Sequence, residues 1–64
     1  MAKEHEAVIR CKILQRTTDA LLIRAETGEG EEDVWIPQST VNQIHEQDGY
    51  IVTERWIAER KGLV

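Results

Sequence analysis

The clearest pattern along the chain is an alternation of apolar and polar residues, which is typical of β-strands with one buried face. One alternating stretch runs from Ala7 to Gln15 and a second from Ala20 to Glu26. The short link between them predicts an antiparallel hairpin. The residues expected to face inward are Ile9, Cys11, Ile13, Leu21, Ile23 and Ala25.

Two further strands are predicted downstream. The third, Asp33–Pro37, ends at a proline that cannot donate a ladder hydrogen bond. We expect Val34 and Ile36 to face inward, which turns Trp35 to the other face of the sheet. The fourth, Tyr50–Val52, follows an Asp-Gly turn signal and is rich in β-branched and aromatic residues.

Helical signals occur in the second half of the chain. The segment Gln38–Glu46 is ambiguous, and a short helix capped by Ser39 is one interpretation. A final helix over Glu54–Lys61 is predicted, with Thr53 as its N-cap. Gly62 fits the left-handed position after a helix, and Leu63 the apolar contact that follows it.

This order of elements predicts a mainly β, α+β fold in one domain of 64 residues, with residues 1–6 frayed. The leading picture is a small curled antiparallel sheet, or an SH3-like or OB-like barrel, of four to five short strands with a C-terminal helix. An open sheet covered on one face by the helix is the alternative.

Charge is unevenly distributed. Eight Lys and Arg against twelve Asp and Glu give a net charge of −4, which counts against general nucleic-acid binding. Residues 26–33 are predicted to form an acidic, solvated loop, and the remainder of the chain is close to neutral. The acids of this loop are Glu26, Glu29, Glu31, Glu32 and Asp33.

The chain lacks the pattern of an enzyme. The candidate nucleophiles are Cys11, Ser39 and several threonines, but neither His5 nor His45 has a spacing that pairs it with Cys11, and Ser39 is better explained as a helix cap. A metal site needs clustered ligands, and none is evident. We therefore expect a non-enzyme without metal or cofactor. One cysteine and no long apolar run favour a cytoplasmic protein that does not enter a membrane.

Two binding functions are open. In the first, Trp35 lies among cations on the outer sheet face, and single-stranded nucleic acid stacks on its ring while phosphates meet Arg10, Lys12 and Arg24. Alternatively, Trp35 belongs to the core and the cations are simply solvated.

In the second, the chain is a protein-interaction module or a homodimer. Its contacts would be Trp56 on the final helix and the acids Glu29, Glu31 and Glu32, which can also imitate nucleic-acid phosphates.

Two segments carry a resemblance. Val34-Trp35-Ile36-Pro37-Gln38-Ser39-Thr40-Val41 and Trp56-Ile57-Ala58-Glu59-Arg60-Lys61-Gly62-Leu63 together resemble small uncharacterised phage, plasmid and bacterial proteins. Those proteins carry a Trp-Ile-Pro-x-Ser signature and end in a Trp-(Leu/Ile)-Ala-x-x-Lys-Gly-Leu helix. The resemblance covers roughly the second half of the chain and implies a nucleic-acid-associated setting, without an assigned activity.

Overall fold

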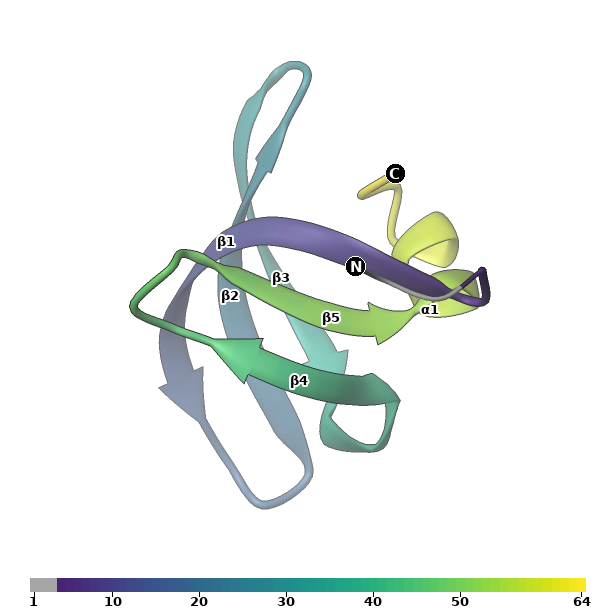
Figure 1. The fold of residues 1–64 in the computed structure, drawn as a ribbon. Helices are drawn as coiled ribbons and strands as arrows, with labels where there is room; N and C mark the ends of the chain where they lie inside the picture. Colours follow the sequence, from purple (N-terminus) through teal and green to yellow (C-terminus); the bar gives the residue numbers. More distant parts are fainter. Residues whose placement is uncertain (1–3) are drawn as a thin grey trace.

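A computed structural model describes residues 4–64 as a five-stranded antiparallel sheet with one short C-terminal helix. The strand order is β3-β2-β1-β5-β4, so β3 and β4 form the two edges (Figure 1). The mainly β prediction is confirmed. The elements in chain order are β1 (Glu6–Arg16), β2 (Ala20–Thr27), β3 (Gly30–Pro37), the 3-10 turn η1 (Gln38–Thr40), β4 (Val41–His45), β5 (Tyr50–Glu54) and α1 (Arg55–Arg60).

The long strand β1 joins the two halves of the sheet. Its first part, residues 6–10, pairs with β5, and its second part, from Cys11 to Arg16, pairs with β2. Figure 1 shows β1 curving between these partners, so that β2 and β3 lie behind β4 and β5. The sheet therefore curls over its own inner face, as the sequence predicts.

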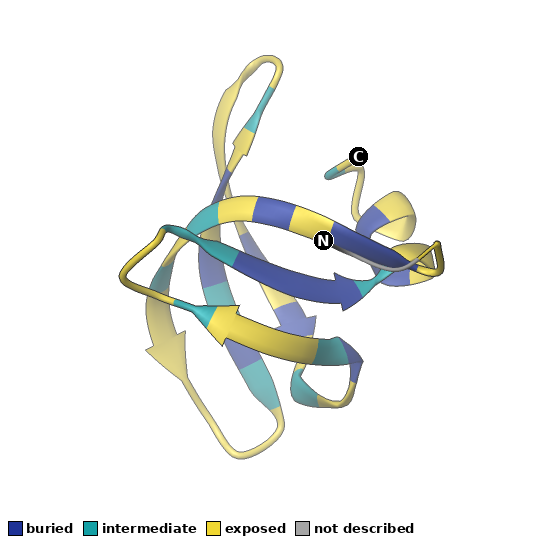
Figure 2. Ribbon diagram, in the orientation of Figure 1, coloured by how far each residue is buried: buried dark blue, intermediate teal, exposed yellow. Residues whose placement is uncertain are grey.

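The inner face of the curled sheet holds the core. Leu21, Ile23, Ala25 and Ile36 are fully buried, and strands β1 to β3 show alternating buried and exposed residues in Figure 2. Cys11 and Ile13 are half-buried against this core. The inward assignments made from the alternation are confirmed. The buried cluster consists of Ala7, Ile9, Leu21, Ile23, Ala25, Val34, Ile36, Ile51 and Ala58.

The prediction and the structure differ most in three segments. Residues 38–46 contain a 3-10 turn and β4, a strand additional to the four predicted, rather than a helix capped by Ser39. The acidic segment 26–33 is the tip of the β2–β3 hairpin, and only Gly28 and Glu29 lie outside its strands. Of the residues expected to fray, 1–3 lie outside the described residues, whereas Glu6 begins β1 and is buried.

The helix α1 begins directly at the end of β5. Thr53 is not its N-cap, because that residue is buried in β5 and its hydroxyl donates to the carbonyl of Glu54. The helix covers Arg55–Arg60 rather than the predicted Glu54–Lys61, but the predicted positions of Gly62 and Leu63 after it are confirmed. Gly62 has a φ of +71°, and its N–H donates to the carbonyl of Glu59. The N–H of Leu63 donates to the carbonyl of Ala58 at 2.8 Å. This pairing satisfies two of the last helical carbonyls and turns Leu63 toward the core.

Candidate binding surface

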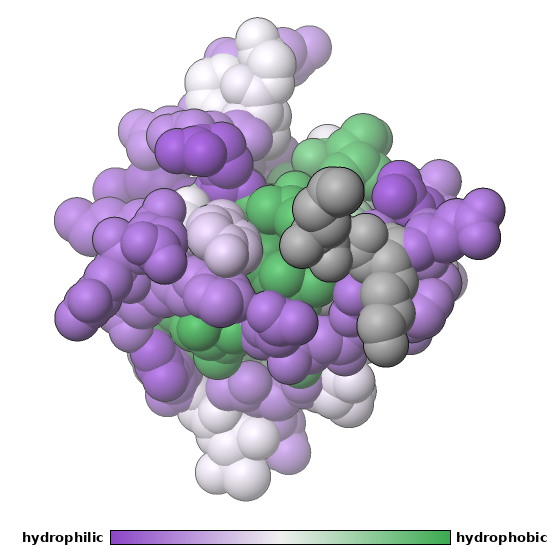
Figure 3. All heavy atoms as spheres, viewed as in Figure 1, coloured by the Kyte–Doolittle hydropathy of each residue, from purple (hydrophilic) through white to green (hydrophobic). Residues whose placement is uncertain are grey.

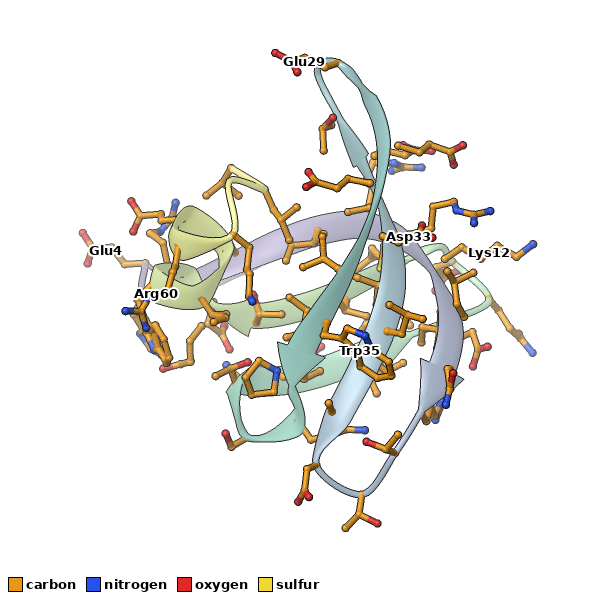
Figure 4. All side chains as sticks on the ribbon, turned by 180° about the vertical axis from the view of Figure 1, so that it is seen from behind. Glu4, Lys12, Glu29, Asp33, Trp35 and Arg60 are labelled. Carbon is orange, nitrogen blue, oxygen red and sulfur yellow. The ribbon has the colours of Figure 1, made fainter. Side chains whose placement is uncertain are left out.

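The outer face of β1, β2 and β3 gathers the residues predicted to bind nucleic acid. Trp35 lies opposite Leu22 on the neighbouring strand, and Arg24 lies between Lys12 and Asp33 in the strand register. The side chain of Trp35 turns outward because Val34 and Ile36 on either side of it are buried. Trp35 is 45% exposed, so it is a surface residue and not part of the core. Figure 4 looks onto this face, with Trp35, Asp33 and Lys12 labelled.

Two of the three cations on this face form ion pairs with carboxylates. The guanidinium of Arg24 donates two hydrogen bonds to Asp33, at 2.9 and 3.3 Å. Arg10 lies 3.7 Å from Glu26. Lys12 makes no ion pair within residues 4–64. The face is therefore a mixed ionic surface around an aromatic ring, and not a basic one.

The Arg24–Asp33 pair changes the titration of both groups. The hydrogen bond from Arg24 lowers the pKa of Asp33, and the same bond raises the pKa of Arg24. Both side chains are about half exposed, which screens the attraction. The pair orients the two groups beside Trp35 and leaves Arg24 less available to a phosphate than a free arginine.

The second predicted group does not form one site. Trp56 is 52% exposed on α1, while the neighbouring Ile57 and Ala58 are buried against the sheet. The acids Glu29, Glu31 and Glu32 belong to the hairpin tip, which projects away from α1 in Figure 1. The fold therefore separates Trp56 from the acids, and it places Glu31 on the same strand as Trp35 instead.

A polar cluster that the sequence did not reveal lies on the other half of the sheet. Asn42 on β4 donates its side-chain amide to the carboxylates of Glu6 and Glu54, both at 2.7 Å. His5 joins them, with its ring nitrogen within 4.8 Å of both carboxylates. Glu6 is only 7% exposed, so the amide supplies hydrogen bonds that a buried carboxylate requires.

The sequence shows no clustered metal ligands, but the ligand atoms of His5, Glu6 and Glu54 lie close enough together to hold a metal ion, and the hydrogen bonds around them also join separate strands. One amide satisfies two neighbouring carboxylates, and Arg55 donates to the backbone carbonyls of Glu4 and Glu6 beside them. These bonds tie the start of β1 to β4 and to α1. Asn42 is 36 positions from Glu6 and 12 from Glu54 in the sequence, and no local motif indicates these contacts.

Cys11, one of the candidate nucleophiles, is a free, half-buried thiol on β1. Burial raises the pKa of the Cys11 thiol, which favours the protonated, unreactive form. His45 stacks on Tyr50 with ring centroids 4.5 Å apart and is hydrogen-bonded to Gln43. Within residues 4–64 no hydrogen bond joins Cys11 to a histidine.

Figure 3 shows the face formed by β1, β4 and β5 as mostly hydrophilic, with hydrophobic residues in small areas. Among residues 4–64, no helix has the length and apolar character needed to cross a bilayer. Comparisons with protein families, curated proteins and solved structures found no match to this chain.

Proposed function

We propose that this protein is a small non-enzymatic binding module that engages a segment of another protein through the outer face of β2 and β3. The observation that carries the proposal is the exposure of Trp35 on an edge strand, next to Leu22 and the Arg24–Asp33 pair. A half-exposed tryptophan beside an oriented ion pair is the composition of a protein-interface anchor.

Charge supports a protein partner over a nucleic acid. The outer face of the first three strands carries Arg10, Lys12 and Arg24, and it also carries Glu26, Glu31 and Asp33. These charges cancel, and the whole chain is at −4. Phosphate binding depends on an excess of cations that release counterions, which this face lacks.

The test is a selection of random twelve-residue peptides on the immobilised protein. We expect the enriched peptides to bind the wild type and Trp56→Ala equally, and to bind Trp35→Ala at least tenfold more weakly. Trp56→Ala is the matched control, because it removes the other exposed tryptophan. Equal binding by Trp35→Ala, or no enrichment on the wild type, would contradict the proposal.

Single-stranded nucleic acid is the second candidate, supported by the position of Lys12 on the face of Trp35 without an ion pair in the described chain. The resemblance of residues 34–41 and 56–63 to phage, plasmid and bacterial proteins points the same way and stays a prediction. A fluorescence titration with an eight-nucleotide single strand at low salt separates the two candidates. Nucleic-acid binding requires quenching of Trp35 that weakens as salt rises and as Lys12→Ala is introduced.

A further inference from the structure

The strand β3 offers a long unpaired edge. It pairs with β2 along its entire length of eight residues, from Thr27 opposite Gly30 to Ala20 opposite Pro37, without an irregularity. No strand of residues 4–64 pairs with its other side. The backbone N–H and C=O groups on such an edge can form a ladder with an added strand. Only Pro37, at the last position, lacks the N–H.

The side chains of this edge define the chemistry of an added strand. Glu31, Asp33 and Trp35 share the outer face of β3, because residues two apart in a strand point the same way. Asp33 is hydrogen-bonded to Arg24, whereas Glu31 makes no salt bridge within residues 4–64 and its charge acts on Arg24 only at longer range. The strand contains no lysine or arginine. Cations on one face of an added strand would lie opposite Glu31 and Asp33 and can stack on the ring of Trp35. Apolar residues on its other face would extend the inner face formed by Val34 and Ile36.

A second copy of the chain complements the edge poorly. Each β3 carries three consecutive acids, Glu31, Glu32 and Asp33, so pairing two copies along this strand collects six carboxylates and no cation from the two edges. Like charges on adjacent strands are destabilising. The edge therefore favours a basic partner over self-association.

We propose that the free edge of β3 takes up, as an added strand, an extended segment of another protein in which Lys or Arg alternates with apolar residues. This inference rests on the proposed function and names the partner class of the same surface. The added backbone hydrogen bonds supply affinity, and the cations opposite Glu31 and Asp33 supply selectivity.

The test uses two synthetic peptides of eight residues, one alternating Lys and Val and the other alternating Glu and Val. Each is titrated into isotope-labelled full-length protein and followed by NMR. We expect only the Lys peptide to bind, with contacts between its backbone protons and those of β3, and with weaker binding as salt rises. Glu31→Lys should weaken the Lys peptide at least fivefold. Glu59→Lys on α1 makes the same change in net charge and should leave the affinity unchanged.

The outcomes separate this inference from the proposed function. Binding of the Lys peptide near Trp35 without backbone contacts to β3 would overturn strand addition and leave a protein-binding face in place. Preference for the Glu peptide, or no binding of either peptide, would overturn the basic partner class. The selection on wild type and Trp35→Ala judges the proposed function independently of both results.

Discussion

The two edges of the sheet are built differently. At one edge, β4 has five residues and an irregularity between Val41 and Gln43, where Asn42 turns aside to bind Glu6 and Glu54. At the other edge, β3 has eight residues in unbroken register. Short length, bulges, charged side chains and proline all protect an edge strand; β4 has the first two, whereas β3 has neither of these and carries three acids and Pro37 instead.

The polar side chains at the two edges also differ in what they contact. The polar side chains at the β4 edge bond one another and hold β1, β4 and β5 together. The polar side chains at the β3 edge are exposed, and Asp33 lies on the same outer face as Trp35 (Figure 4). The β4 edge is short and irregular and its Asn42 is hydrogen-bonded to residues of β1 and β5, whereas the β3 edge is long and regular, which is why the proposal places the partner on β3.

The largest effect is expected at Ile36, which is fully buried on the inner side of β3. Ile36→Ala should lower the free energy of unfolding by about 2–5 kcal/mol, because it leaves a cavity in the core. Its neighbour Trp35→Ala should lower it by less than about 1 kcal/mol, since that side chain is on the surface. Urea unfolding measures both. Equal losses would show that the two faces of β3 are not distinct.

The next largest effect is expected at Asn42 on β4, which is hydrogen-bonded to Glu6 and Glu54. Asn42→Ala removes the donor shared by Glu6 and Glu54 and leaves two neighbouring carboxylates without it. We expect the free energy of unfolding to fall by about 2–3 kcal/mol, because one of the carboxylates is buried. Urea unfolding is the measurement.

The double variant Asn42→Ala with Glu54→Gln is the control for that experiment. The introduced amide removes one negative charge and can donate to Glu6, so part of the lost stability should return. A loss below about 0.5 kcal/mol in the single variant would contradict a bracing role for this cluster.

A smaller, pH-dependent effect is expected from the Arg24–Asp33 pair. The pKa of Asp33 is lowered in the folded protein, so the pair contributes stability above the unfolded-state pKa of about 4, and this contribution is lost as pH falls through the folded pKa. Asp33→Asn should therefore be less stable than the wild type at about pH 7 and closer to it at about pH 3. A stability difference that stays constant between these pH values would contradict the assignment.

Glu32→Gln provides the comparison for that pair. Glu32 is an exposed acid on the same strand and has no ion pair in residues 4–64. Its substitution should change stability by no more than about 0.5 kcal/mol at neutral pH.

The smallest effect is expected at Lys12, two strands away from the β3 edge. Lys12→Ala should change the affinity for the Lys-Val peptide by less than about twofold, because no added strand on β3 reaches β1. Isothermal titration measures this. A large loss would place the binding surface across the middle of the sheet, where the nucleic-acid hypothesis places it.

The alternation of apolar and polar residues predicts most of the strands, and the strand it misses, β4, is missed for a physical reason. The strands β1, β2 and β3 were found because their apolar residues recur at every second position. The irregularity in β4 inserts one residue between Val41 and Gln43, which places the apolar Val41 and Ile44 three apart and imitates a helix. Thr53 is predicted to be the N-cap of the helix, because the sequence does not show that β5 runs directly into α1.

The candidate site was predictable only in part. The outward position of Trp35 follows from its two buried neighbours, without knowledge of the tertiary fold. The pairing of Arg24 with Asp33 depends on the register of the β2–β3 hairpin, and a composition-based loop assignment for residues 26–33 concealed that register. The contacts of Asn42 depend on the curl of the whole sheet.

The most direct test of the contrast between the two edges is an NMR titration that follows the backbone amides of both edge strands in one sample with the Lys-Val peptide. We predict shifts and slowed hydrogen exchange in residues 31–36 of β3, with residues 41–45 of β4 unchanged. Protection of β4, or shifts spread evenly over both edges, would contradict the proposal that β3 is the available edge.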